Sequence, residues 1–413
     1  MAERSILHVD QNCFFASVEM KSHPQWRDIP MAVGGDSEKR HGIILAKNRH
    51  AQAYGVKTAE AIWQAKQKCP DLLVVPAHFE QYVYYSERTR DLFLQYTDLV
   101  EPFGLDECWL DVTASSIGTG REIADEIRER VKSELGLSCS VGVSFNKSFA
   151  KLGSDYKKPD ATTEITRENF QSVVWPLPVA DLLFVGRATE AVLAKMNIRT
   201  IGDLAKLQPD FAVSVLGKNG YALWRSANGL EDDPVRPASY ERPLKSVGNS
   251  TTTPRDMCTR KDVHEVVSTL SAQVASRLRK HHFCAGTVTI WVRDVHLQSY
   301  EKQRALPSET NDEQAIAKLA MELFDESYDW HAPIRSFGVR TTNLSDEQDF
   351  HQMTIFENIE KTQKDDKVNR ALDGIRSRFG YDVVMRGTQL QGKGDLCEEG
   401  REDHPHGGFK EDL

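Results

Sequence analysis

The chain has 413 residues, of which 40% are hydrophobic and 27% charged, and its net charge is −9. This length suggests about two to four globular domains, and no apolar run approaches the roughly 18 residues of a membrane span. The seven cysteines are odd in number and form no CxxC pair, which argues against structural zinc and predicts a cytoplasmic protein. Asp10 interrupts any signal-peptide pattern at the start.

The negative charge is unevenly distributed along the chain. Residues 345–413 contain ten Lys and Arg against sixteen Asp and Glu, whereas residues 242–304 contain eleven against five. A basic segment followed by an acidic tail is typical of a DNA-binding body with a separate tail. Proteins without a DNA partner show similar patterns, so charge alone leaves the partner open.

The first part of the chain alternates strand and helix patterns. Their order of strand, helix, two strands, helix and strand is the split βαβ pattern, with an insertion of about 60 residues after the first strand and helix. The expected strands are residues 5–9, 29–35, 42–46, 72–76, 100–113 and 137–144, and the expected helices are residues 13–21, 48–56, 58–70, 79–97 and 120–135.

The remainder of the chain divides into three parts. Residues 176–207 are helical with short turns, and the breaker-rich residues 231–243 read as a linker. A small α+β unit follows, with strands expected at residues 287–295 and 333–344 and helices at residues 260–281 and 311–328. Past Leu344 come a short motif, a charged helix at residues 366–382, and a polar, glycine-rich end that predicts disorder.

Three acids point to a chemistry. Asp10 ends the first expected strand, and Asp106 and Glu107 lie where two later strands meet. In a split βαβ sheet these strands are neighbours, so the three carboxylates converge at one end of the sheet. Crowded carboxylates need a neutralising cation, and hard oxygen ligands suit Mg²⁺. Two such ions stabilise an in-line displacement, so the pattern indicates phosphoryl or nucleotidyl transfer.

Each acid also has a plain structural explanation. A lone aspartate at a strand end commonly caps a helix or forms a turn, and an acidic pair at a hairpin is commonly solvated. Glu107 is harder to dismiss, because Cys108 and Trp109 follow it in an apolar strand, where a charge needs a partner.

Three longer motifs make the pattern specific. They are HVDQNCFFASVEM from residue 8, EPFGLDECWLDVT from residue 101 and VGVSFNKSFAKLGSDYKKPD from residue 141. In order and spacing they resemble the motif blocks of the Y-family, DinB-like DNA polymerases. The resemblance covers residues 5–345, and a shorter variant of the pattern continues to about residue 390.

The resemblance implies an α+β multidomain polymerase with a ferredoxin-like palm, inserted fingers, a helical thumb and an α+β little finger. The implied domains are residues 1–10 and 80–168 (palm), 11–79 (fingers), 169–236 (helix-hairpin-helix-like thumb), 237–246 (linker), 247–345 (little finger) and 346–413 (clamp motif, helix and disordered tail). The implied reaction is template-directed, low-fidelity translesion synthesis without proofreading. The enzyme would add deoxynucleotides to a primer 3′-hydroxyl with two Mg²⁺ ions, for which Mn²⁺ could substitute.

The family's catalytic residues match positions of this chain. By that resemblance Asp10 and Asp106 would hold both metals, Glu107 the catalytic metal, and the backbone carbonyl of Gln11 the nucleotide-bound metal. Lys158 would contact the incoming triphosphate, where its charge favours the pyrophosphate leaving group. Without the motif, Lys158 would be interpreted as a surface lysine.

Phe15 falls where the family has its steric gate, a ring that leaves no room for a ribonucleotide 2′-hydroxyl. Phe14 and Phe15 cannot both face one side of a helix, so we expect Phe14 to pack inward and Phe15 to face the nucleotide. Tyr82 resembles a family tyrosine near this pocket, with Tyr84 or Tyr85 as alternatives.

The fingers motif departs from the family pattern. Where members often carry ANYxAR, this chain has KNRHAQ at residues 47–52, so Arg49 replaces the tyrosine and Gln52 the arginine that touch the triphosphate. We hypothesise that Arg49, or Lys47, supplies the missing charge. Asn12, where many members have a second acid, completes the expected nucleotide-binding set with its two successors, Cys13 and Phe14.

Two regions are expected to hold primer–template DNA. In the thumb, Gly186 belongs to a turn that resembles a helix-hairpin-helix, which aims backbone N–H groups at a phosphate; Phe184 replaces its first glycine, and a plain helical hairpin is the alternative. In the little finger, the residues expected near phosphates are Lys245, Ser246, Arg255, Arg293 and Arg340. Phosphate contacts carry no sequence information and weaken steeply with salt.

The peptide QMTIF resembles the motif by which bacterial polymerases dock on the sliding clamp. Ile355 and Phe356 would fill an apolar pocket of the clamp, and Gln352 would make polar contacts. The implied partners are therefore primer–template DNA, a deoxynucleoside triphosphate and the clamp, with a monomeric chain and no membrane.

Two other functions remain open at this stage. A non-catalytic clamp-binding scaffold is the first, against which the intact Asp10, Asp106 and Glu107 argue. A nucleotide cyclase with a similar palm is the second, against which the helical thumb and the basic third domain argue. The residue chemistry by itself supports nucleotidyl transfer, and the family resemblance supplies lesion bypass.

Overall fold

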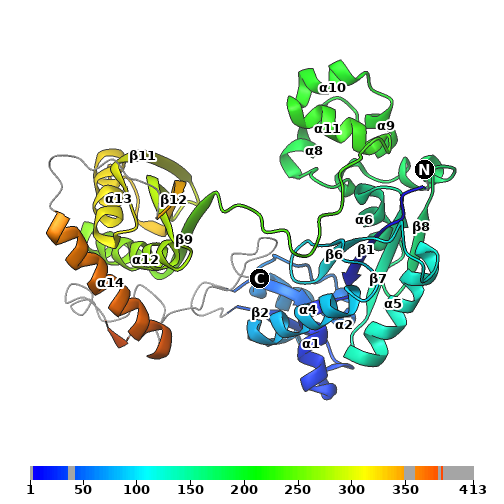
Figure 1. Ribbon diagram of the computed structural model, residues 1–413, viewed down its shortest axis with the longest axis horizontal. Coiled ribbons are helices and arrows are strands. Elements are labelled where there is room, and N and C mark those ends of the chain that lie inside the picture. The colour runs from blue at the N-terminus through cyan, green and yellow to red at the C-terminus, as the bar shows by residue number, and fades with distance from the viewer. Residues whose placement is uncertain (1–2, 36–41, 348–358, 380–382, 385–413) are drawn as a thin grey trace. The chain divides into compact units, whose positions relative to one another are not determined.

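The computed structural model describes residues 3–35, 42–347, 359–379 and 383–384. They divide into two compact units, one of residues 3–35 and 43–241 and one that begins at Arg242 (Figure 1). Within the described ranges, no helix has both the length and the apolar character needed to cross a bilayer.

A five-stranded sheet organises the first unit. Its strand order is β5-β6-β1-β7-β8, and the central strand β1 runs antiparallel to both neighbours. All six residues of β1 are buried, so its sequence does not alternate between residues facing solvent and residues facing a core. The strands are β1 (Ile6–Gln11), β5 (Val100–Pro102), β6 (Glu107–Asp111), β7 (Cys139–Ser144) and β8 (Thr162–Ile165).

Three helices accompany the five-stranded sheet: α4 (Phe79–Phe93), α5 (Gly120–Leu135) and α6 (Lys147–Tyr156). The α5 helix begins with a capping box between Thr119 and Glu122. The α6 helix lies very close to β7, because a Cβ at Gly142 would come within 1.8 Å of the Ala150 carbonyl oxygen. This close approach brings the side chains of α6 to the carboxylate end of the sheet.

A smaller three-stranded sheet with the order β3-β2-β4 lies within the same unit. Its strands are β2 (Met31–Gly34), β3 (Ile44–Lys47) and β4 (Leu73–Val75). The short helices near it are α1 (Phe14–Ser22), η1 (Pro24–Trp26), α2 (Arg49–Ala53) and α3 (Ile62–Lys68). Its apolar core includes Ala32, Ile44 and Ile62 and is separate from the core of the larger sheet.

The first unit ends in a helical segment whose core, around Val174, Leu193 and Leu223, is shared with Phe149 of α6 and Ile165 of β8. Its helices are α7 (Phe170–Val174), η2 (Val179–Asp181), α8 (Arg187–Lys195), α9 (Ile201–Ala205), α10 (Pro209–Leu216) and α11 (Lys218–Ala227). Residues 230–245 then run without helix or strand.

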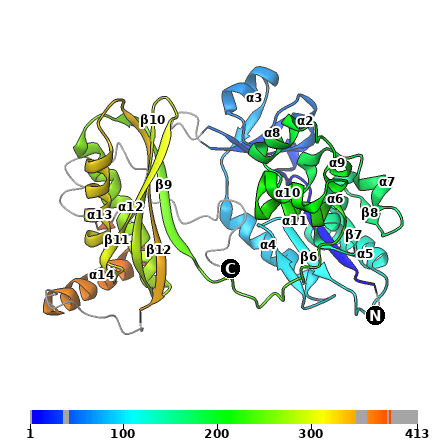
Figure 2. The ribbon, with the colours of Figure 1, turned by 90° about the horizontal axis from the view of Figure 1, so that it is seen from above.

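The second unit is an antiparallel sheet in the order β11-β10-β12-β9. Helices α12 and α13 pack on one face of the sheet (Figure 2). The elements are β9 (Ser246–Met257), α12 (Arg260–Lys280), β10 (Phe283–Asp294), β11 (Ser299–Thr310), α13 (Glu313–Ser327), β12 (Ile334–Asp346) and α14 (Ile359–Phe379).

The sequence patterns located many of these elements but missed two long strands, β9 and β11. Strand β11 was not predicted, because most of its side chains are exposed and it has no continuous apolar face. The expected pair of strands in residues 100–113 is present as β5 and β6, with Asp106 in the turn between them. The helix expected at residues 79–97 ends earlier, at Phe93.

Candidate active site

The structure brings the three predicted acids together. In the ladder between β1 and β6, Asp10 lies directly opposite Glu107, and the Gln11 backbone N–H donates to the Asp106 carbonyl oxygen at 3.0 Å. Asp10 is 5% exposed. Acids that are far apart in sequence therefore share one end of a buried sheet (Figure 1).

Burial and crowding perturb these carboxyl groups in different directions. Burial raises the pKa of Asp10 to about 7, and Glu107 and Asp106 add to the rise while Lys158 opposes it. Burial, together with the charge of Glu107, raises the pKa of Asp106 to about 6. Burial also acts to raise the pKa of Glu107, but its interactions with His8 and Lys151 outweigh burial and hold that pKa at about 2.

Two lysines neutralise the cluster. Lys158 Nζ lies 2.6 Å from Asp10 Oδ2 and 2.7 Å from Asp155 Oδ1, and Lys151 forms an ion pair with Glu107. Burial would lower the pKa of Lys158, but these carboxylates raise it overall. The expected triphosphate lysine thus contacts a predicted metal ligand in this structure.

The donor set fits a divalent cation. In the described part of the chain, no group of three His, Cys, Asp or Glu side chains already has a metal-binding arrangement, and Lys158 and Lys151 pair with two of the carboxylates. Asp10, which is buried, and Asp106, which is half-buried, both have raised pKa values, so added positive charge is favourable here. Carboxylate oxygens are the ligands that Mg²⁺ and similar hard cations prefer.

His8 is a site residue that the sequence analysis missed. It is fully buried, its Nδ1 lies 2.8 Å from Ser154 Oγ, and its ring meets Trp109 edge-on with centroids 5.1 Å apart. Its Nε2 lies 3.2 Å from Glu107 Oε2, without the alignment of a hydrogen bond. The alternation of strand side chains could have identified it, because His8 and Asp10 are two residues apart and share a face of β1.

An aromatic group lies beside the acids, at the start of α1. Phe14 is buried and Phe15 is partly exposed. The rings of Phe15 and Tyr82 stack in parallel, 4.2 Å apart with an interplanar angle of 9°. Tyr82 is fully buried, and its hydroxyl donates to Glu19. Tyr82 therefore covers one face of the Phe15 ring.

Tyr84 and Tyr85 have other surroundings. Tyr84 is 53% exposed, and Tyr85 lies under the ammonium of Lys21, 4.6 Å from the ring centroid. Of the three tyrosines considered from the sequence, Tyr82 is the one that the structure stacks on Phe15.

Comparison with known proteins identifies the family to which this arrangement belongs. One family model, described as the impB/mucB/samB family, matches residues 9–155, and another, described as the C-terminal domain of that family, matches residues 244–355. The chain belongs to the impB/mucB/samB family. The DNA polymerase IV of Acetivibrio thermocellus is 48% identical over 95% of this chain and 99% of its own length.

More distant relatives agree. The DNA polymerase IV 1 of Bacillus subtilis is 34% identical over 94% of each chain. A solved structure described as a Y-family DNA polymerase chimera has a similar fold, with a TM-score of 0.73 and 23% identity over 82% of this chain and 99% of its own. The predicted Y-family, DinB-like relationship and the α+β multidomain fold class are confirmed.

The departures of this impB/mucB/samB family member from the usual fingers motif lie in and beside α2. Arg49 is exposed at the first position of α2, Gln52 is exposed one turn later, and Lys47 Nζ donates to Thr58 Oγ1 at 3.2 Å. Burial raises the pKa of Cys13, while Lys47, Arg49 and Lys158 act to lower it. The positive charges of these three side chains therefore act on the same place at the start of α1.

Asn12 is buried just beyond Gln11 and pairs with Ser140, with its amide 2.9 Å from Ser140 Oγ. Strand β7 thus holds the side chain of Asn12, at the position where many family members carry an acid. This hydrogen bond accounts for Asn12 structurally.

The residues predicted to bind DNA lie in both units. Gly186 precedes α8, and the preceding Phe184 has a φ of 69° and is 78% exposed. In the second unit, Arg293 and Arg340 alternate with the buried Val292 and Val339, so they lie on the sheet face opposite α12 and α13. Lys245 and Ser246 stand at the start of β9, and Arg255 lies 3.4 Å from Asp262.

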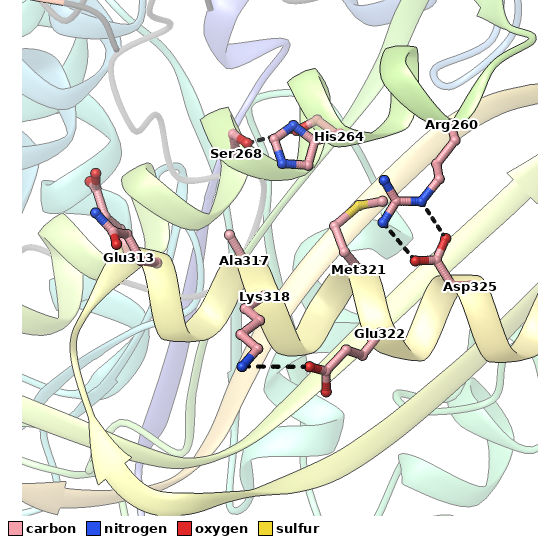
Figure 3. A pocket seen from close by; sticks show the side chains of 10 residues that line it. Arg260, His264, Ser268, Glu313, Ala317, Lys318, Met321, Glu322 and Asp325 are labelled. Atoms are coloured by element: carbon pink, nitrogen blue, oxygen red, sulfur yellow. Dashed lines mark hydrogen bonds and ion pairs between the residues drawn. The ribbon is translucent and has the colours of Figure 1, made fainter. Parts of the chain in front are cut away.

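A cavity of about 480 Å³ lies between α12 and α13 and contains none of the predicted site residues (Figure 3). Its charges are compensated: Arg260 forms two hydrogen bonds with Asp325, and Lys318 lies 4.0 Å from Glu322. We therefore assign it no role in the chemistry of the acids. The clamp motif residues Gln352, Ile355 and Phe356 lie outside the described residues.

Proposed function

We infer that this chain is a DNA-directed DNA polymerase of the translesion type. The inference is supported by relatives named DNA polymerase IV that match nearly the whole chain. The observation that carries it is the pairing of Asp10 with Glu107 beside Asp106 at one end of a buried sheet. The presence of all three acids gives no support to a non-catalytic scaffold.

The enzyme uses divalent metal ions, and we propose that they are two Mg²⁺ ions. Asp10 and Asp106 would hold both ions, Glu107 one of them, and the Gln11 carbonyl the one that accompanies the nucleotide. Such ions neutralise the charge that develops on the attacking and leaving oxygens. Lys158 and Lys151 pair with the carboxylates of Asp10 and Glu107, which supports the assignment of this cluster as a place that attracts cations.

Lys158 is proposed to serve the triphosphate. Its ammonium is already among the acids, 2.6 Å from Asp10. With Asp10 compensated by a divalent ion, the ammonium of Lys158 would be available to the triphosphate oxygens and would stabilise the charge of the departing pyrophosphate.

Phe15 is proposed to select deoxynucleotides. Its ring is backed by the parallel ring of Tyr82 and by the edge of Phe79, with centroids 4.2 and 5.8 Å away. A ring held from behind cannot withdraw to admit a 2′-hydroxyl. The remaining nucleotide contacts are assigned to the main chain and side chains around Phe15 and to the fingers, namely Asn12, Cys13, Phe14, Arg49 and Gln52, with Lys47 as the alternative to Arg49.

The domain roles follow the family arrangement. We assign the larger sheet to the palm, the smaller sheet to the fingers, the helical segment to the thumb and the second unit to the little finger, with the boundaries predicted from the sequence. The DNA-contacting residues are proposed to be Gly186, Lys245, Ser246, Arg255, Arg293 and Arg340. We further propose a cytoplasmic monomer that docks on the sliding clamp through Gln352, Ile355 and Phe356.

Primer extension with Mg²⁺ tests the central proposal. The double substitution Asp106→Ala, Glu107→Ala should abolish templated extension by a protein that still folds and binds DNA. The control is Glu164→Ala, which removes an exposed acid of β8 in the same sheet. Undiminished extension by the double variant would contradict the assignment of the acids.

A further inference from the structure

Helix α14 is attached to the second unit by its polar side. Asp373 accepts two hydrogen bonds from Arg279 of α12, at 2.6 and 2.9 Å, and Asn369 donates to Asp312 at 3.2 Å. Arg376 Nη1 lies 3.9 Å from Glu313 Oε2. Asn369 and Arg376 are buried, so residues at spacings of four and three form one attached face.

The same helix exposes an apolar face. Val368, Ile375 and Phe379 are separated by seven and four positions, which places them along one side of a helix. They are 47%, 38% and 66% exposed, and we call them the α14 stripe. An amphipathic helix ordinarily packs its apolar side on its own domain, and here the polar side takes that place.

Stability of the second unit alone does not explain this orientation. Arg279 is 4% exposed, and burying an ion pair costs desolvation that its hydrogen bonds only roughly offset. Three large apolar side chains meanwhile remain in water. The ion pair fixes the orientation of the helix, and the α14 stripe therefore faces outward.

The size of the α14 stripe indicates what can cover it. A stable interface between two proteins uses about 20–30 residues on each side, and three apolar side chains are far fewer. The stripe is therefore too small to hold a second copy of this chain or an independent partner. It suits an auxiliary contact with a partner that is already bound close by, because linkage gives the second contact a high effective concentration.

The peptide that is proposed to bind such a partner, the sliding clamp, comes immediately before α14 in the sequence. The helix begins at Ile359, three positions after Phe356, the last residue of the clamp-binding peptide. Two exposed cations, Lys367 and Arg378, lie next to members of the stripe in sequence. A matching surface on the partner would be apolar with acidic residues at its edge.

We propose that the α14 stripe is a second contact with the sliding clamp, beside the pocket that takes the peptide, and that Arg279 and Asp373 hold it outward. This inference rests on the proposed clamp binding. The polymerase would thus grip the clamp through a peptide and an ordered helix together, which restricts how the second unit is oriented on the clamp.

The test measures binding of the full chain to the immobilised sliding clamp of the same organism. The double variant Ile375→Ser, Phe379→Ser should bind about tenfold more weakly through loss of the linked contact, with unchanged extension in the absence of clamp. The control, Ile117→Ser with Phe211→Ser, removes an equally exposed pair from the first unit and should bind as the wild type does. Circular dichroism and melting temperature confirm that each variant folds.

A third variant, Phe356→Ala, separates the two proposals. If Phe356→Ala abolishes binding while the stripe variant binds like the control, the role of the stripe is overturned and the clamp proposal stands. If Phe356→Ala leaves binding unchanged, or the wild type does not bind, both fail. A wild type that sediments as a dimer and a stripe variant that sediments as a monomer would assign the stripe to a second copy and overturn the inference.

Discussion

The two larger sheets of this chain place their charged residues in opposite ways. The five-stranded sheet buries Asp10 opposite Glu107 and surrounds the pair with His8, Lys151 and Lys158. The four-stranded sheet carries Arg293 and Arg340 on its open face, the one opposite α12 and α13, where they alternate with buried valines. One sheet forces charges together out of water, and the other spreads them in water.

This difference shows how each sheet can act. Buried charges interact strongly and require specific partners, so the acids define one local chemistry. Exposed charges are screened by salt and act nearly independently, which suits phosphates of any sequence. The predictions below separate these behaviours, since changes at the buried site should alter selectivity or chemistry and changes on the open face should alter affinity alone.

The largest effect is expected at the buried site, from Phe15→Ala. Removing the ring opens space for a 2′-hydroxyl, and the preference for deoxynucleotides over ribonucleotides should fall by about 100-fold. The measurement is the ratio of kcat/KM for the two nucleotides, and Phe211→Ala, at an exposed position of α10, is the control. A preserved ratio in an active Phe15→Ala enzyme would show that another residue excludes ribonucleotides.

A smaller effect is expected on the open sheet face. The double substitution Arg293→Ala, Arg340→Ala should weaken primer–template binding equally for all sequences and reduce the slope of log Kd against log salt by about 2. The rate of nucleotide addition to DNA that is already bound should not change. Lys318→Ala, on the helical side of the same unit, is the control. A change in single-turnover rate with an unchanged slope would assign these arginines to catalysis.

Arg49→Ala tests the unusual fingers motif and should have a moderate effect. Arg49 contributes positive charge near Cys13, so its loss should raise the KM for the nucleotide by about tenfold, the effect of a lost charge-assisted contact. Lys57→Ala, an exposed lysine next to the fingers helices, should have no such effect. If Arg49→Ala is silent and Lys47→Ala raises KM, the charge comes from Lys47.

The extent to which the sequence predicted this molecule also differs between the two sheets. Strands β1, β6 and β7 are short, buried and followed by helices, so apolar runs and acids at their ends could be recognised. Strand β11 was missed because its side chains are mostly exposed. Lys151 was missed because nothing in a linear sequence shows that α6 approaches β7 closely enough to bring its side chains to Glu107. The inverted orientation of α14 likewise depends on a distant ion pair with Arg279.

The last predicted effect concerns protons at the acids. The pKa of Asp10 is raised to about 7 and that of Asp106 to about 6, above the ordinary value of 3.8. The folded, metal-free chain thus holds these protons more tightly than the unfolded chain, so their contribution to stability is present below pH 4 and is lost as the pH rises through about 7. A divalent ion must displace the remaining protons, so its apparent affinity should be about tenfold lower at pH 6 than at pH 8.

Thermal unfolding with increasing Mg²⁺ at these two pH values measures the effect. The rise in Tm should begin at lower Mg²⁺ concentration at pH 8. Asp10→Asn should remove most of the rise at both pH values, because it removes a carboxylate proposed to hold both ions. Glu164→Gln, at the exposed position of β8, should retain it. Equal Mg²⁺ dependence at both pH values in the wild type would mean that the ion does not bind at the buried acids, and the contrast between the two sheets would then concern packing and not chemistry.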